Sequence, residues 1–326
     1  MKHCIRISLL LFVLLWTLAW TMTGEKPRET APEEAPEPTQ TAAPCDGAKI
    51  LRVLHGGAVE EMTMEQYLLG VLRAEMPASF EFEALKAQAI AARTYTLYKM
   101  NGGEIANHPD ADACDNINCC KAYRTAEDAA AQWGDMAVYY EEKLLRAVRE
   151  TDGQVVLYEG EPILAVFCSS VGGSTQNAGA VWQSDLPYLQ SVSSPETEAL
   201  VPNYYSTVRA TAEEFRSLVH AVRPDADLSG SPEAWIRDIC RSDAGFVTEL
   251  TVGGVRMRGN DLRTALSLRS PAFTVEVSGD TLTFRVTGYG HGVGMSQYGA
   301  NAMAQEGKTC AEILTHYFAG TVVGAA

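Results

Sequence analysis

A glutamate lies where a predicted amphipathic helix should present an apolar side chain. Thr63 and Gln66 have the spacing of a capping box, which predicts that the helix begins here. The residues that follow form one apolar stripe at helical spacing, made of Met64, Tyr67, Leu68, Val71 and Leu72. Glu75 comes about three turns after the start of this stripe and lies on the same face. Pro77 ends the helix, because the residue before a proline resists helical geometry.

The position of Glu75 predicts a carboxyl group with a raised pKa. A core-facing carboxyl loses solvent, which disfavours its charged form. The C-terminus of a helix also disfavours negative charge, because the helix dipole is negative there. A glutamic acid that stays protonated near neutral pH has the property that a general acid needs. The alternative is a side chain that swings past the helix end into solvent or pairs with a cation.

A second predicted helix, from Glu83 to Met100, carries two cations. Its alanine-rich sequence favours helix and permits close packing. Lys86 and Arg93 are seven residues apart and share one face. Such a pair can hold an acidic or carbonyl-bearing substrate, which makes Arg93 a candidate binding residue. The alternative is that these side chains are solvated, and this is the preferred interpretation for Lys86.

Four soft metal ligands fall within thirteen residues, namely His108, Cys114, Cys119 and Cys120. Imidazole and thiolate groups together suit zinc. The cluster is therefore a candidate zinc site. The spacing is not that of a standard zinc knuckle, so a disulfide or plain buried thiols remain the alternatives.

The rest of the chain mixes helices and strands, which predicts an α+β fold. Extended segments are expected at residues 50–57, 154–158, 163–167, 246–252, 271–279 and 281–288. The last two alternate in polarity around Gly279-Asp280, which predicts a hairpin. Further helices are expected from Thr211 to Val222 and from Met295 to Phe318. We expect a single large mixed domain with a substrate cleft.

The N-terminus has the features of an export signal. Lys2 and Arg6 precede an uncharged apolar run, Ile7 to Met22. Bulky residues stand where a cleavage site would need small ones, so residues 1–23 are predicted to be a signal-anchor that spans the membrane once. The basic residues on its short side place the body outside the cytoplasm. A cleaved signal is the alternative.

Composition separates the remaining chain into a linker and a body. Residues 24–48 are rich in Pro and Glu without apolar periodicity, which predicts a disordered linker. Residues 49–326 form the predicted domain. The chain of 326 residues has 46% hydrophobic residues and a net charge of −15. An acidic surface repels phosphate backbones, which argues against nucleic acid as a partner.

Four sequence blocks, in order, resemble the stage II sporulation protein D family. The first is YLLGVLRAEMPASFEFEALKAQAIAARTY at residues 67–95, and the second is HPDADACDNINCCKAY at 108–123. The third is AVFCSSVGGSTQNAGAVWQSDLPYLQSV at 165–192. The fourth combines LRTALSLRSPAF with GYGHGVGMSQYGA at 262–273 and 288–300. Together they cover about residues 50 to 320.

The resemblance implies a lytic transglycosylase that cleaves peptidoglycan glycan strands already stripped of peptide stems. The catalytic acid of the family lies in an Ala-Glu-Met-Pro segment, which places that role on Glu75. The acid protonates the glycosidic oxygen, and the sugar's own 6-hydroxyl then closes on C1 to give a 1,6-anhydro end. Hydrolysis would ordinarily need a second carboxylate, and none stands out in the matching blocks. One alternative is a glycan-binding module that stimulates a cell-wall amidase, and another is a zinc-dependent hydrolase.

The resemblance also implies a sporulation context and a set of ligand-binding residues. The expected partners are a cell-wall amidase and a membrane partner of the engulfment machinery. The candidate substrate-binding residues are Arg93, Ser169, Ser170, His291, Gln297 and Tyr298. Gln297 and Tyr298 can hydrogen-bond to and stack on sugar rings, and the glycines around His291 permit close backbone approach. For His291 a local cap in a tight turn is the alternative.

Two histidines of the family pattern are cysteines in this chain. The family binds zinc through a cysteine, matched by Cys114, and a histidine five residues later, where this chain has Cys119. The resemblance thus implies one zinc ion per chain, held by Cys114 and Cys119, with His108 as a candidate third ligand. Cys168 likewise stands where relatives have histidine before two serines. Because both changes replace histidine by cysteine in a protein expected outside the cell, a Cys119–Cys168 disulfide is an open alternative to part of the zinc site.

Overall fold

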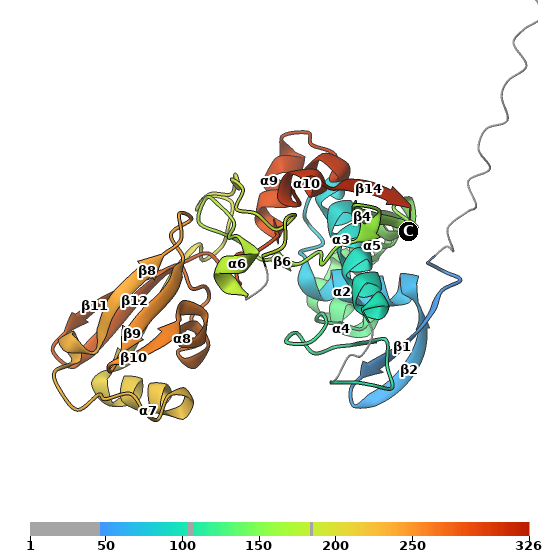
Figure 1. Cartoon of the computed structure of the whole chain (residues 1–326). Helices are drawn as coiled ribbons and strands as arrows, with labels where there is room; N and C mark the ends of the chain where they lie inside the picture. The colour runs from blue at the N-terminus through green and yellow to red at the C-terminus, as the bar shows by residue number, and fades with distance from the viewer. Residues whose placement is uncertain (1–45, 103–106, 183–184, 326) are drawn as a thin grey trace, which may run out of the picture. The chain divides into compact units, whose positions relative to one another are not determined.

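The computed structural model describes residues 46–102, 107–182 and 185–325, which belong to one compact unit (Figure 1). The predicted signal-anchor, residues 1–23, lies outside these ranges, as does most of the predicted linker, residues 24–48. Across the described ranges, no helix has both the length and the apolar character that crossing a bilayer requires. The boundary predicted between linker and domain, after residue 48, is too late, because Asp46 is already buried in the folded domain.

The domain opens with a hairpin that leads into the helix carrying Glu75. Strand β1 (Ile50–His55) pairs antiparallel with β2 (Ala58–Thr63) and parallel with the short β3 (Ala113–Cys114). Helix α2 (Met64–Glu75) begins with the capping box predicted for Thr63 and Gln66. The helix ends at Glu75, directly before Met76 and Pro77, as predicted.

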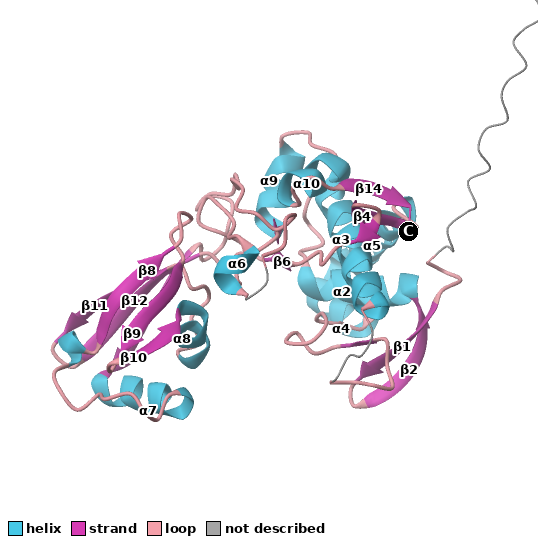
Figure 2. Ribbon diagram, in the orientation of Figure 1, coloured by secondary structure: helices cyan, strands magenta, loops and turns pink. Residues whose placement is uncertain are grey.

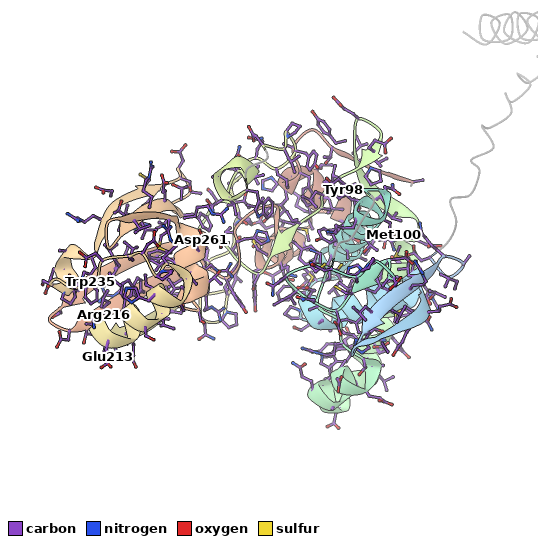
Figure 3. All side chains as sticks on the ribbon, turned by 60° about the horizontal axis from the view of Figure 1, so that its bottom comes forward. Tyr98, Met100, Glu213, Arg216, Trp235 and Asp261 are labelled. Carbon is purple, nitrogen blue, oxygen red and sulfur yellow. The ribbon has the colours of Figure 1, made fainter. Side chains whose placement is uncertain are left out.

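The core of this part of the domain is built around one buried helix, α3 (Phe82–Asn101). Its alanines let α2, α5 (Ala137–Glu150), α9 (Gln297–Gln305) and α10 (Cys310–Tyr317) all pack against it. Figure 3 labels Tyr98 and Met100 near its C-terminal end. A small sheet of β4 (Gln154–Tyr158), β5 (Glu161–Pro162) and β14 (Val322–Ala325) covers another side.

A second hydrophobic core lies among residues 205–287. Its strands are β7 (Tyr205–Thr211), β8 (Ile236–Arg241), β9 (Val247–Val252), β10 (Val255–Arg258), β11 (Phe273–Ser278) and β12 (Thr281–Thr287). They form two three-stranded antiparallel sheets with the orders β10-β9-β8 and β11-β12-β7. Helices α7 (Ala212–Val222) and α8 (Gly259–Ala265) accompany them (Figure 2). Arg216 of α7 lies 5.2 Å from the ring centroid of Trp235 (Figure 3).

A pair of two-residue strands joins distant parts of the chain. β6 (Phe167–Cys168) pairs parallel with β13 (Met295–Ser296), which leads directly into α9. Next to it, the backbone N–H of Tyr298 donates to the carbonyl of Ser169 at 3.0 Å. The remaining helices of the described ranges are α4 (Ala126–Trp133), α6 (Ala178–Val181) and two short 3₁₀ turns, Gly134–Met136 and Pro232–Ala234.

The α+β prediction is confirmed, and so are most of its elements. The hairpin around Gly279-Asp280 joins β11 to β12, and Thr211 caps α7. The single helix predicted from Met295 to Phe318 is wrong, because two helices stand there. Gly307 adopts a left-handed φ of 87° between them, and a capping box at Thr309 starts α10. Of the strand predicted at 163–167, only Phe167 is in a strand.

Candidate active site

Glu75 is the last residue of α2 and is fixed by a backbone contact. Its Oε1 accepts a hydrogen bond of 3.0 Å from the N–H of Ala122. Burial is the largest influence on its pKa and raises it above the ordinary glutamate range. The charge of Lys121 and the N–H of Ala122 act in the opposite direction without cancelling this effect. Glu75 therefore has the raised pKa that its place in the sequence predicts.

Lys121 is a buried cation beside this carboxyl group. It is 8% exposed, and its Nζ lies 3.8 Å from the ring centroid of Tyr95 and 3.9 Å from that of Phe167. Burial lowers the pKa of Lys121 to about 8, while the carboxylate of Glu75 opposes this shift. The two aromatic faces stabilise the ammonium group in a place where water is excluded. Sequence reasoning missed Lys121, because a lysine in a loop is ordinarily solvated.

Glu75 opens into a pocket of about 380 Å³. The pocket is lined by the end of α2 and the turn after it, by α4 and α5, and by the start of α9. Three aromatic side chains contribute to the walls, namely Trp133, Tyr140 and Tyr298. Trp133 and Tyr140 meet edge to face with ring centroids 5.6 Å apart. Aromatic faces with polar neighbours are suited to sugar rings, which present apolar faces and hydroxyl edges.

Three of the predicted substrate-binding residues line the same pocket as Glu75. Ser169 reaches it from the segment after β6, and Gln297 and Tyr298 reach it from the first turn of α9. The β6–β13 pairing brings these segments together although more than a hundred residues separate them. Tyr298 is held by Phe80, whose ring meets it edge to face at 4.9 Å. The structure thus gathers these side chains around the carboxyl group.

Ser170 and His291 lie elsewhere. Ser170 is 2% exposed, and its backbone pairs with that of Tyr289. His291 Nδ1 accepts a hydrogen bond of 3.1 Å from the N–H of Val293, which is the local turn cap that the sequence left open. Its ring lies 5.4 Å from that of Trp182. Burial lowers the pKa of His291 to about 4, so the ring is neutral at physiological pH.

The structure does not support the prediction that Arg93 binds substrate. Arg93 is 1% exposed and lies outside the lining of the Glu75 pocket. Its Nε donates to both carboxylate oxygens of Asp46 at 3.0 and 2.9 Å, and its Nη1 donates to the carbonyl of Gln154 at 3.0 Å. The prediction considered only the residues of the helix, whereas the partner Asp46 comes from a segment 47 residues earlier in the chain. Arg93 therefore joins the N-terminal segment to the core.

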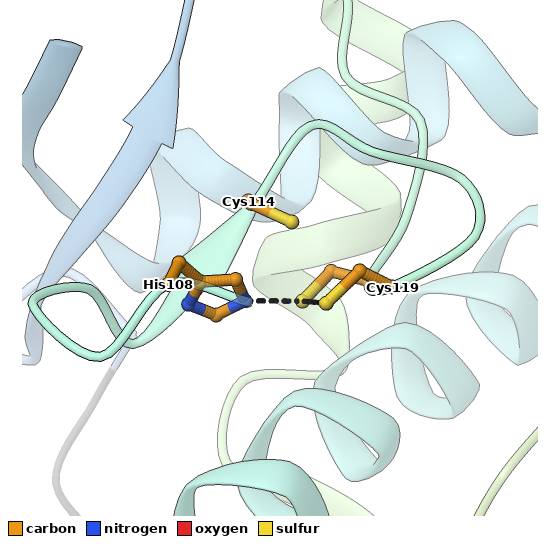
Figure 4. A group of neighbouring side chains, drawn as sticks. His108, Cys114 and Cys119 are labelled. Atoms are coloured by element: carbon orange, nitrogen blue, oxygen red, sulfur yellow. Dashed lines mark hydrogen bonds between the residues drawn. The ribbon is translucent and has the colours of Figure 1, made fainter. Parts of the chain in front are cut away.

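The three predicted metal ligands, His108, Cys114 and Cys119, lie together (Figure 4), and Cys120 belongs to the same group. One ligand atom from each of His108, Cys114, Cys119 and Cys120 can be chosen so that all lie within 4.8 Å of one another. In a tetrahedral zinc site the ligand atoms lie roughly 3.5–3.8 Å apart, so a small contraction would suffice. Cys120 was visible in the sequence cluster, but only the fold shows that its sulfur joins the other three. The cluster can bind a metal ion.

The histidine of this cluster is oriented for metal binding. His108 Nδ1 lies 2.9 Å from the carbonyl of Ala111, an acceptor, so this nitrogen carries the proton. Its Nε2 is left as the acceptor and lies 3.2 Å from Cys120 Sγ. Burial raises the pKa of the Cys114 thiol, and that of Cys120 to about 12. Thiols in such surroundings become thiolates only when a cation compensates their charge.

The structure shows no Cys119–Cys168 disulfide, because both residues are free thiols. Cys168 is buried against Val171 and Phe246, while Cys119 belongs to the His/Cys cluster. The alternative in which a disulfide replaces part of the metal site is therefore not the arrangement observed.

Comparison with known proteins agrees with the resemblance seen in the sequence. A family model described as "Stage II sporulation protein" matches residues 55–158. Stage II sporulation protein D of Bacillus subtilis (strain 168) is 38% identical over 270 residues, which are 82% of this chain and 76% of the relative. The protein of that name from Bacillus amyloliquefaciens is 36% identical over 269 residues, with the same coverage of 82% and 76%. The amidase enhancer of Bacillus subtilis (strain 168) is 27% identical over 303 residues, covering 78% of this chain and 40% of that protein.

Proposed function

Because the chain belongs to the stage II sporulation protein D family, we propose that it is a peptidoglycan lytic transglycosylase with Glu75 as general acid and base. Membership of this family places it in the cell-wall biology of sporulation. The observation that carries the catalytic proposal is the state of one carboxyl group. Glu75 is half-buried, has a raised pKa, is oriented by the Ala122 amide and opens into an aromatic pocket.

The proposed reaction uses Glu75 twice. Its protonated carboxyl gives its proton to the glycosidic oxygen as the bond from C1 of the muramic sugar to that oxygen breaks. The 6-hydroxyl of the same sugar then bonds to C1, and its proton passes to the ionised Glu75. The products are a free 4-hydroxyl and a 1,6-anhydro end, and the acid is regenerated.

The acidic residues that line the pocket favour formation of a 1,6-anhydro end over hydrolysis. A glycoside hydrolase ordinarily places a second carboxylate near the first, to attack the sugar or to activate water. Within the described ranges, Glu75 is the one acidic residue that lines the pocket. A reaction in which the substrate supplies its own nucleophile needs no second carboxylate. The buried charge of Lys121 supports the carboxylate form that exists between the two proton transfers.

A product analysis tests the catalytic proposal. Glycan strands stripped of peptides are incubated with the wild-type protein or with Glu75→Gln, and their ends are identified by mass spectrometry. We expect 1,6-anhydro ends with the wild type and a loss of at least a hundredfold with the variant, as is usual when a general acid is removed. Undiminished anhydro product from Glu75→Gln would overturn the proposal. Ordinary reducing ends, lost on chelation, would instead indicate a zinc-dependent hydrolase.

A second function, stimulation of a cell-wall amidase, is supported by one of the relatives. The similar protein from Bacillus subtilis (strain 168) carries the name amidase enhancer. A glycan-binding module would need the pocket walls but no proton donor. Adding Glu75→Gln to an amidase digest separates the two functions. Full stimulation of stem release by the variant, without anhydro ends, would assign stimulation to binding alone.

We also propose that the His/Cys cluster holds one structural zinc ion. His108, Cys114, Cys119 and Cys120 offer one imidazole and three thiols, a donor set that zinc accepts in closed sites. A zinc ion there would cross-link the segment whose next residues are Lys121 and Ala122. This segment supplies both the amide and the charge that act on Glu75.

We propose that the body is exported and stays attached to the membrane through residues 7–22. The support is the basic N-terminus followed by an uncharged apolar run. Membrane fractionation combined with external protease tests it. Protease should remove the body from intact protoplasts, and detergent alone should release the untreated protein. A soluble, shortened body in the medium without protease would show that the signal is cleaved.

A further inference from the structure

The wall of the Glu75 pocket carries two arginines in different electrostatic states. Arg73 is neutralised by Glu141, since its Nε donates to Oε2 at 2.9 Å and its Nη2 donates to Oε1. Arg124 has only neutral partners, because its Nη1 donates to the carbonyl of Arg73 at 3.2 Å and to the amide oxygen of Gln132. Among the described residues, no carboxylate oxygen lies within 4.0 Å of the Arg124 guanidinium.

Arg124 brings a positive charge without an acidic partner to the wall of the pocket. The chain has 41 acidic residues against 26 Lys and Arg, and nine of the fifteen other arginines that the structure describes pair with an acid. Because Arg73 is neutralised by Glu141, Arg124 is the one cation without an acidic partner on the pocket lining that the structure describes. The guanidinium of Arg124 therefore offers this pocket a charge that an anionic group of a ligand can neutralise.

The position of Arg124 is fixed relative to the proton donor. Its backbone N–H donates to the carbonyl of Gly70 at 3.0 Å, and its side chain donates to the carbonyl of Arg73. Both acceptors belong to α2, the helix that ends in Glu75. Both side-chain hydrogen bonds of Arg124 come from Nη1, so Nε and Nη2 have no partner among the described residues and can donate to a carboxylate side by side.

We propose that Arg124 binds the lactyl carboxylate of a muramic acid residue and thereby makes the pocket select peptide-stripped glycan. This inference rests on the proposed glycan substrate. Each muramic acid carries a lactyl ether, whose carboxyl group is an amide while a peptide stem is attached and a free carboxylate once the stem is removed. The lactyl carboxylate that would pair with Arg124 therefore exists only on stripped strands. A stemmed strand offers a neutral amide and a bulky chain in its place.

Binding measurements in an inactive background test the inference. The probes are short peptide-stripped strands, the same strands with their carboxyl groups methylated, and an uncharged chitin oligosaccharide. With Glu75→Gln as the parent, we expect Arg124→Gln to raise the dissociation constant for stripped strands by about tenfold or more. Methylation of the parent's ligand should weaken binding to the same extent, and the two changes together should add almost nothing further. Binding of the chitin oligosaccharide should be unaffected by Arg124→Gln.

Two further variants control for fold and for net charge. Arg256→Gln removes one positive charge from β10, where the residue is 73% exposed and pairs with Glu249 outside the pocket, so it should leave binding unchanged. Arg124→Lys keeps the charge without the paired donors and should recover part of the affinity. The inference is overturned if Arg124→Gln weakens binding of all three probes equally, since this would make Arg124 a structural cation at the C-terminus of α2. It is also overturned if stripped and methylated strands bind the parent equally.

These outcomes are independent of the catalytic test. The binding series uses a protein without its proton donor, so it reports on recognition alone. Suppose that stripped and methylated strands bind equally well, while the wild type still forms anhydro ends that depend on Glu75. This result would contradict the role of Arg124 but not the proposed reaction. Retention of the preference without Glu75-dependent cleavage would do the reverse.

Discussion

At the scale of single residues, the environment of Glu75 predicts how stability depends on pH. Burial raises its pKa in the folded state, so the folded protein favours the protonated carboxyl. The stabilisation from this preference is complete below the unfolded pKa, about 4.3, and is lost as pH rises through the folded value. Glu75→Gln should therefore be more stable than the wild type at pH 7, within the roughly 0.5–2 kcal/mol usual for a stabilising change. Below about pH 4 the difference should vanish.

Urea unfolding of both proteins at several pH values measures this difference. Glu161→Gln, an exposed change on β5, serves as the control and should show no such dependence. Equal stability of wild type and Glu75→Gln at every pH would mean that the carboxyl group is solvated.

Asp46 and Arg93 predict a large effect from one residue outside the pocket. Asp46→Ala would leave the guanidinium of Arg93 buried without its acid, which ordinarily costs about 3–5 kcal/mol. The change should lower the urea midpoint strongly, while the fraction that remains folded keeps its ability to form anhydro ends. Arg149→Gln, which breaks an exposed ion pair with Glu65, should cost less than about 1 kcal/mol. If Asp46→Ala were stable but failed to bind glycan, this would support the prediction that Arg93 binds substrate.

At the scale of elements, α9 depends on a glycine at its first turn. A Cβ on Gly299 would lie 2.1 Å from the Tyr317 hydroxyl and 2.3 Å from Ser194 Oγ. Both groups belong to a buried network around Glu196, whose Oε1 also accepts from Ser296, the N-cap of α9. Gly299→Ala should therefore cost about 1–3 kcal/mol as overpacking. It should also lower activity, because Gln297 and Tyr298 begin the same helix.

Thermal melting and product formation measure both effects. Gly230→Ala is the matched control, since a Cβ there meets no atom within 4 Å, and it should change neither quantity. If Gly299→Ala lowers the melting temperature but cleavage is unchanged, the geometry at the start of α9 does not determine activity.

At the scale of the whole molecule, the His/Cys cluster connects the first sheet to the active-site segment. Cys114 lies in β3, which pairs with β1, whereas Cys120 precedes Lys121 and Ala122. We expect one zinc ion per chain, measured by elemental analysis of protein purified without chelator. Removing it should lower the melting temperature, and Cys120→Ser should weaken zinc retention. Cys240→Ser, which changes an exposed thiol outside the cluster, should have no effect.

The affinity for zinc should fall steeply below neutral pH. Three thiols must lose their protons to bind the ion, so more protons compete than at a site with one thiol and one imidazole. Zinc retention measured between pH 5 and pH 8 tests this. Protein that contains little zinc and two fewer free thiols than expected would instead indicate a disulfide.

Local pattern alone determined the elements that carry the chemistry. The capping box at Thr63 and the proline at 77 set both ends of α2, and the apolar stripe placed Glu75 toward the interior. The metal segment and the β11–β12 hairpin were equally visible. These features depend on residues close in sequence, whose periodicity and turn chemistry are local properties.

Tertiary structure decided which side chains meet. Arg93 lies on the predicted helix, but it is buried and its guanidinium pairs with the carboxylate of Asp46. Lys121 acquires an aromatic neighbour from a segment far along the chain, and Arg124 reaches the pocket through bonds to α2. A buried charge survives only where distant groups compensate it, and periodicity carries no information about those groups. The sequence could therefore indicate a proton donor, whereas the fold alone determined its pocket and the charges around it.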